Sequence, residues 1–142
     1  LEFPLRRHTK KFGIIEDTTP LVMEALENVG LEHAIDLMPS ELSGGMKRRI
    51  ALARTLILQP KIILYDEPTT GLDSITSREI SELMLDIQKK NKTTSIIITH
   101  DMECAKLTGN RIVILKDGVI HAEGSYETLE KSDDDWVRSF FI

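Results

Sequence analysis

The chain of 142 residues is predicted to form an α/β fold, with a mostly parallel sheet flanked by helices and an antiparallel hairpin. Two apolar segments, Lys61–Asp66 and Thr93–Thr99, have the pattern of buried strands, and an amphipathic segment separates them. Strands that alternate with helices are typical of a parallel sheet. Asp117 and Gly118 lie between two further apolar runs and predict the hairpin, because a two-residue turn of this kind needs positive φ.

Helices are predicted around these strands from capping residues and apolar spacing. Leu1–Asp17 has no such signals and is predicted to be irregular or extended. Thr19 and Pro20 predict a helix N-cap and first helical residue, and Gly30 predicts the end of that helix. Further helices are predicted at Glu32–Leu37, from Ser43 as cap to about Leu58, at Met102–Leu107, after Ser125 as cap and at Asp134–Phe140. Another begins at Asp73 or Ser74, and its inward residues are predicted to be Ile80, Leu83, Met84 and Ile87.

Composition limits the classes of protein that this chain can represent. A hydrophobic content of 41% and a charged content of 29% are ordinary for a globular protein. The formal net charge of -5 argues against a nucleic-acid partner, since such proteins usually carry a basic face. The single cysteine, Cys104, excludes an intrachain disulfide. No apolar run reaches the roughly 20 residues that cross a bilayer, so we expect any membrane role to depend on a partner.

Reactive side chains follow both predicted strands, at Asp66-Glu67 and at His100. Ligands of open α/β sheets bind beyond the carboxyl ends of the strands, so this placement suits a nucleotide site. We assign Asp66 to Mg²⁺, which prefers oxygen ligands, and Glu67 to the attacking water. His100 is assigned to the γ-phosphate. A solvated acidic pair and a structural histidine are the alternatives, and the turn from Pro68 to Asp73 disfavours the first of them.

Ser43, Gly44 and Gly45 are predicted to open a helix and to form an anion site there. Backbone N–H groups, the positive helix end and the Ser43 hydroxyl would all face a phosphate. The cations Lys47, Arg48 and Arg49 oppose the helix dipole, a cost that a bound polyphosphate would offset. The alternatives are a capped helix with a flexible entry and a solvated basic face.

The chain resembles the ATP-binding subunit of ABC transporters over nearly all of its length. Leu42-Ser43-Gly44-Gly45-Met46 is similar to the signature loop, Ile62–Glu67 to Walker B, Gly71-Leu72-Asp73 to the D-loop, and His100 to the switch histidine. Phe3–Thr9, Asp36–Met46 and Asp134–Phe141 resemble in particular the subfamily that powers Mce-type, or "toluene tolerance", phospholipid transporters. Met46 stands where the family more often has Gln.

The resemblance implies a partial P-loop NTPase-like core. No G-x-x-x-x-G-K-[ST] phosphate loop occurs in the sequence. We therefore interpret residues 1–142 as the C-terminal part of one nucleotide-binding domain. Residues 1–58 would form most of the helical subdomain with the signature helix, and residues 59–142 would form the second part of the catalytic core, which ends in the hairpin.

The resemblance further implies ATP and Mg²⁺ as cofactors and a head-to-tail dimer with a second ATP-binding subunit. Asp66, Glu67 and His100 would serve one ATP, Ser43, Gly44, Gly45 and Met46 the other, and Asp73 would lie at the dimer seam. The subunit would be peripheral, on the cytoplasmic face of the inner membrane beneath a permease, and would drive phospholipid transport. We expect this chain alone to be inactive and to self-associate.

Three other functions remain open from the sequence. One is an ABC-type ATPase that acts on ribosomes or DNA, the second is an importer ATPase for another small molecule, and the third is a module that keeps the fold without the activity. The acidic composition and the absence of coiled-coil insertions disfavour the first.

Overall fold

The computed structural model describes residues 1–7 and 17–141 of the chain. These residues form two compact units, Leu1–Tyr65 with Asp86–Ile96 and Asp66–Leu85 with Ile97–Ile142. The predicted boundary near residue 58 between a helical subdomain and a core therefore stays a prediction, since the compact units divide the chain at other residues.

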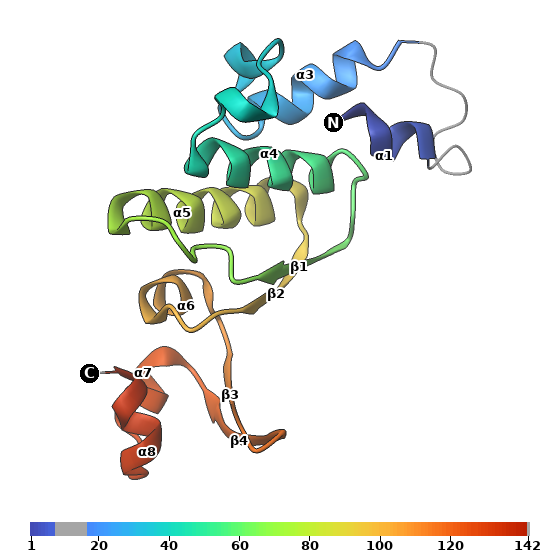
Figure 1. Cartoon of the computed structure of the whole chain (residues 1–142). Helices are drawn as coiled ribbons and strands as arrows, with labels where there is room; N and C mark the ends of the chain where they lie inside the picture. Colours follow the sequence, from blue (N-terminus) through green and yellow to red (C-terminus); the bar gives the residue numbers. More distant parts are fainter. Residues whose placement is uncertain (8–16, 142) are drawn as a thin grey trace. The chain divides into compact units, whose positions relative to one another are not determined.

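The first unit begins with helical segments (Figure 1). They are α1 (Glu2–Arg7), α3 (Thr19–Glu27), the 3-10 helices η1 (Glu32–Ala34) and η2 (Pro39–Glu41), and α4 (Gly44–Leu56). The helix predicted at residues 32–37 is thus a shorter 3-10 turn, whereas α4 begins directly after its predicted cap, Ser43. Helices α3 and α4 pack against each other, and Val22, Ala25, Leu26 and Ala53 are buried in this unit.

Helix α1 corrects the prediction of an irregular N-terminal segment. Arg6 donates to the Glu2 carboxylate at 2.8 Å, one helical turn away, and Leu5 is 1% exposed. Burial of one leucine and an i,i+4 ion pair favour the helix. The sequence pattern did not show this because the apolar anchor is a single residue. Positions 8–16 of the predicted segment lie outside the described residues.

The start of α3 lies one residue earlier than predicted. Its N-cap is Thr18, without a side-chain capping bond, and Pro20 is the second helical residue. Asp17 Oδ1 instead accepts from the Thr19 N–H at 2.9 Å. A carboxylate that satisfies a free N–H at a helix start replaces the hydroxyl cap that the sequence suggested.

Two short strands, β1 (Ile62–Asp66) and β2 (Thr94–Ile98), pair with each other, and α5 (Ser74–Asn91) connects them. The Thr94 N–H donates to the Lys61 carbonyl at 2.9 Å, and the Glu67 N–H donates to the Ile98 carbonyl at 2.9 Å. Since both partners advance in the same direction along the chain, the strands are parallel, as predicted.

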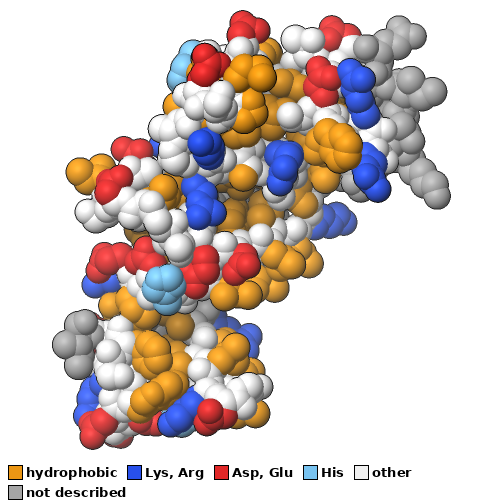
Figure 2. All heavy atoms as spheres, viewed as in Figure 1, with side chains coloured by type: hydrophobic (Ala, Val, Ile, Leu, Met, Phe, Trp, Pro, Cys, Tyr) orange, Lys and Arg blue, Asp and Glu red, His pale blue; other side chains and the backbone are white. Residues whose placement is uncertain are grey.

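Neither strand is buried as the sequence led us to expect. Ile63 is 2% exposed, but Ile62 is 59% and Leu64 73% exposed, and in β2 Ile96 and Ile98 are 54% and 63% exposed. Side chains alternate between the two faces of a strand, so these four share one face. Figure 2 shows hydrophobic side chains gathered over β1 and β2. The prediction was wrong because no described element covers this face.

The second unit contains a helix, the hairpin and the C-terminal helices. They are α6 (Met102–Thr108), β3 (Ile112–Lys116), β4 (Val119–Gly124), α7 (Tyr126–Glu130), α8 (Asp135–Arg138) and the 3-10 helix η3 (Ser139–Phe141). Asp117 and Gly118 have φ of 51° and 80°, as the predicted turn requires. Ile114, Leu129 and Val137 form a small core that holds the hairpin to α7 and α8.

Candidate functional site

The carboxyl ends of β1 and β2 bring Glu67 and His100 together. The backbone N–H of Glu67 donates to the Ile98 carbonyl at 2.9 Å, which extends the pairing of the strands by one step. Glu67 has φ of 47°, a left-handed conformation that turns the chain sharply out of the strand. Its carboxylate Oε2 then lies 2.8 Å from Nδ1 of His100.

This contact changes the pKa of both groups. The hydrogen bond to Glu67, and then the attraction of its charge, raises the pKa of His100 above 6.5. The hydrogen bond from His100 lowers the pKa of Glu67 below 4.5. Thr70 Oγ1 also donates to Glu67 Oε2 at 3.0 Å. The ion pair is open to solvent, because the His100 side chain is 76% exposed.

A second hydrogen bond connects the segments that follow the two strands. Thr69, which is 4% exposed, donates from Oγ1 to Asp101 Oδ2 at 2.8 Å. The other oxygen of Asp101 accepts from the N–H groups of Glu103 and Cys104 and so caps α6. Sequence reasoning missed the roles of Thr69, Thr70 and Asp101. An aspartate directly before a helix is a capping signal, but its bond to Thr69 depends on tertiary structure.

Asp66, the predicted metal ligand, ends β1 and is exposed. Among residues 1–7 and 17–141, no three His, Cys, Asp or Glu side chains are grouped to hold a metal ion. Mg²⁺ is usually held by one or two carboxylates together with phosphate oxygens and water, so a cluster of three is not needed. An exposed carboxylate at a strand end therefore fits this ion.

Asp73, predicted at a dimer seam, is bonded within its own helix start. Its Oδ1 accepts from the N–H groups of Ile75 at 3.1 Å and Thr76 at 3.0 Å, and its Oδ2 accepts from Thr76 Oγ1 at 2.7 Å. These bonds, that of the Thr76 N–H first, lower the pKa of Asp73. Asp73 therefore caps α5, and its side chain stays exposed in this structure.

Ser43, Gly44 and Gly45 lie at the N-terminus of α4 in the first unit. Ser43 Oγ accepts from the Met46 N–H at 3.2 Å, the capping bond that the sequence predicted. Just before, Glu41 Oε2 accepts from the Met38 N–H at 2.6 Å and orders the approach to Ser43. Ser43 and Gly44 are exposed, and Gly45 and Met46 are half-buried. The geometry is that of a capped helix N-terminus open to solvent.

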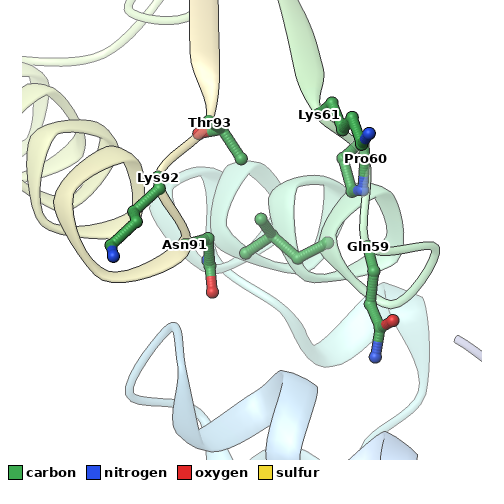
Figure 3. A pocket seen from close by; sticks show the side chains of 7 residues that line it. Gln59, Pro60, Lys61, Asn91, Lys92 and Thr93 are labelled. Carbon is green, nitrogen blue, oxygen red and sulfur yellow. The ribbon is translucent and has the colours of Figure 1, made fainter.

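A shallow pocket of about 220 Å³ lies in the first unit, away from these residues along the chain. Its lining residues precede the two strands rather than follow them: Leu56, Gln59, Pro60, Lys61, Asn91, Lys92 and Thr93. Figure 3 shows Thr93 directing its methyl group toward the pocket and the Lys92 amine pointing away from it. The polar groups do not converge, so the pocket is not a candidate for the nucleotide site.

No helix among the described residues is both long and apolar enough to span a bilayer.

The chain is similar to known sequences of one family. The profile of the family described as "ABC transporter" matches residues 5–70. The chain is 41% identical over 138 residues to the intermembrane phospholipid transport system ATP-binding protein MlaF of Escherichia coli (strain K12), covering 97% of this chain and 51% of MlaF. It is 40% identical to the probable ribonucleotide transport ATP-binding protein mkl of Mycobacterium leprae, covering 97% of this chain and 39% of mkl. The chain thus spans about half or less of the length of these relatives.

Solved structures with a similar fold are ATP-binding cassettes. One is the dimeric cassette MJ0796 in a post-hydrolysis state bound to ADP and phosphate, with 35% identity and a TM-score of 0.68 over 80% of this chain and 50% of that one. Another is MJ1267, described as an ATP-binding cassette of an ABC transporter, with 27% identity and a TM-score of 0.78 over 91% of this chain and 52% of that one.

Proposed function

Because this chain belongs to the ABC transporter family of ATP-binding domains, we propose that Glu67 and His100 act together on the γ-phosphate side of one bound ATP. The contact of 2.8 Å between their side chains carries this proposal. Phosphoryl transfer depends on positioning and on neutralising charge. Glu67 would orient the attacking water, and His100, whose raised pKa favours the cationic imidazolium, would stabilise the phosphate charge.

Asp66 is the proposed ligand of Mg²⁺, which would supply charge neutralisation at the phosphates when it is bound with ATP. The strand geometry supports this assignment, because Asp66 is the last residue of β1 and Glu67 turns away from it with positive φ. Two adjacent carboxylates can thus serve different partners. Thr70 donates to the Glu67 carboxylate and would limit its rotation.

We propose that Ser43, Gly44, Gly45 and Met46 serve the ATP of a second subunit in a head-to-tail dimer. A capped, exposed helix N-terminus supports this role, since its N–H groups and dipole favour an anion. The solved MJ0796 cassette is dimeric. Asp73 would lie at the seam of this dimer and would keep the α5 cap while it makes contacts there.

The proposed transport activity belongs to the whole protein. Phospholipid is the proposed cargo, because the chain is similar to MlaF and carries segments that resemble the phospholipid-transporter subfamily. The permease would be an integral membrane partner, and this subunit would lie beneath it on the cytoplasmic face. The identity to mkl, which is named for ribonucleotide transport, is nearly as high. A cargo assay therefore has to distinguish phospholipid from ribonucleotide transport. Since the present sequence has no phosphate loop, we propose that it does not hydrolyse ATP by itself.

Replacement of the proposed base tests the enzymatic assignment. In the full-length protein, Glu67→Gln should lower kcat by about 100-fold or more, because a general base contributes that much, while ATP stays bound. Glu130→Gln, an exposed substitution on α7, is the matched control and should keep wild-type turnover. Undiminished hydrolysis by the Glu67 variant would refute the assignment.

Cargo is tested separately with the full-length protein and its permease in liposomes. ATP-dependent transfer of a labelled phospholipid to acceptor vesicles is expected. Hydrolysis without lipid transfer would leave the ATPase assignment standing and would reject phospholipid as the cargo.

A further inference from the structure

The C-terminal end of α3 is fixed in a way that presents one carbonyl to α4. The Leu31 N–H donates to the Leu26 carbonyl at 2.9 Å and the Gly30 N–H donates to the Glu27 carbonyl at 3.0 Å. Gly30 has φ of 67°, so the helix ends in a left-handed residue. The last carbonyls of a helix have no partner within it and need a donor from elsewhere. Val29, just before this turn, is fully buried.

Arg49 of α4 supplies a donor for this end of α3. Its Nη1 donates to the Val29 carbonyl at 3.1 Å, and the bond is partly shielded from solvent. A cation at a helix C-terminus also interacts favourably with the helix dipole. A Cβ at Gly30 would lie 3.8 Å from Nη1, an ordinary van der Waals distance. The glycine is therefore favoured here by its positive φ and not by lack of space.

The same helix carries Ser43 as its N-cap. Arg49 follows Ser43 by fewer than two helical turns, or about 9 Å along the axis at 1.5 Å per residue. A helix of this length is stiff over two turns, so a bond that fixes Arg49 also fixes the Ser43 hydroxyl and the N–H groups of Gly44 and Gly45. The bond joins Arg49 to a carbonyl 20 residues earlier in the chain, so the segment between α3 and α4 is fixed at both ends.

We propose that Arg49 is a positioning residue that sets where the Ser43–Gly45 helix start lies relative to α3 through its bond to the Val29 carbonyl. The proposal rests on the proposed function of Ser43–Gly45 at the ATP of a second subunit. Loss of the bond between Arg49 and Val29 should weaken the contribution of the Ser43–Gly45 helix start to ATP turnover. It should leave ATP binding by Asp66, Glu67 and His100 of the same chain unaffected.

The test uses the full-length protein assembled with its permease, in wild-type form and as Arg49→Gln and Arg49→Lys. Arg49→Gln should lower kcat about tenfold and change KM for ATP less than twofold. Arg49→Lys keeps a cationic donor and should recover at least a third of the activity. Arg54→Gln, an exposed arginine on the same helix, is the control and should behave as wild type.

A second measurement separates positioning from general instability. Hydrogen exchange should become faster at the Val29–Leu31 and Ser43–Met46 amides of Arg49→Gln and stay unchanged at β3 and β4. Wild-type kcat in Arg49→Gln, or faster exchange throughout the protein, would overturn the proposal. If the wild-type protein does not hydrolyse ATP, the proposed function fails, and the exchange data still decide whether Arg49 fixes the start of α4.

Discussion

His100 Nδ1 and Glu67 Oε2 lie 2.8 Å apart, although the whole of α5 lies between these two residues in the chain. The strands that precede them are paired from the bond between the Thr94 N–H and the Lys61 carbonyl to the bond between the Glu67 N–H and the Ile98 carbonyl. The contact exists because the strands are parallel and end together. Glu67, the candidate base, and His100, the candidate ligand of the γ-phosphate, are therefore paired in this structure.

We expect Glu67→Gln to lower the pKa of His100, because the hydrogen bond and charge of Glu67 raise it. The pair is complete when Glu67 is ionised and His100 is protonated. Its contribution to stability is lost as the pH falls through the lowered pKa of Glu67, and again as the pH rises through the raised pKa of His100. An NMR titration of the His100 ring in the present chain measures this shift.

The control for this titration is Glu130→Gln, which should leave the His100 pKa as in wild type. An equal pKa of His100 in Glu67→Gln and wild type would show that the two side chains do not pair in solution.

Thr69→Val should destabilise the chain by about 1–3 kcal/mol, because it leaves a partly buried Asp101 oxygen without its donor. Denaturant unfolding followed by circular dichroism measures the loss. Thr55→Val removes an exposed hydroxyl that bonds the Ala51 carbonyl of its own helix, and it should stay within about 0.5 kcal/mol of wild type. Equal effects of the two substitutions would argue against a structural role for the Thr69 bond.

Ser43→Ala and Ser125→Ala form a matched pair of cap substitutions. Both serines accept a backbone N–H bond at 3.2 Å, so each alanine variant should lose about 0.5–2 kcal/mol of stability. In the full-length protein, Ser43→Ala should also lower ATP turnover, whereas Ser125→Ala should not. Equal turnover in the two variants would mean that Ser43 acts as a helix cap alone.

We expect the present chain to self-associate through the exposed face of β1 and β2, since large apolar patches on a soluble surface favour association. Leu64→Lys, at a side chain that is 73% exposed, should lower the sedimentation coefficient toward that of a monomer. Ile75→Lys, at an exposed residue of α5, is the control and should have little effect. A wild-type chain that sediments as a stable monomer would contradict this expectation.

The predictions from sequence succeeded where the chemistry is local. The Asp117-Gly118 turn, the Ser43 and Ser125 caps and the parallel strand pair all agree with the structure, because each depends on a few neighbouring residues or on simple alternation. The helix at Glu2–Arg7 and the cap at Thr18 were missed, since packing of Leu5 and a carboxylate at Asp17 decided them.

The sequence by itself determined the family motifs and the order of the candidate site residues, since apolar strands followed by acid or imidazole groups can be recognised along the chain. Only the tertiary structure decided which groups meet. The bonds from His100 to Glu67, from Thr69 to Asp101 and from Arg49 to Val29 join residues on different elements. Tertiary structure also decided that Leu64 and Ile98 are exposed, because burial of a strand depends on the elements that cover it and not on its own hydrophobicity.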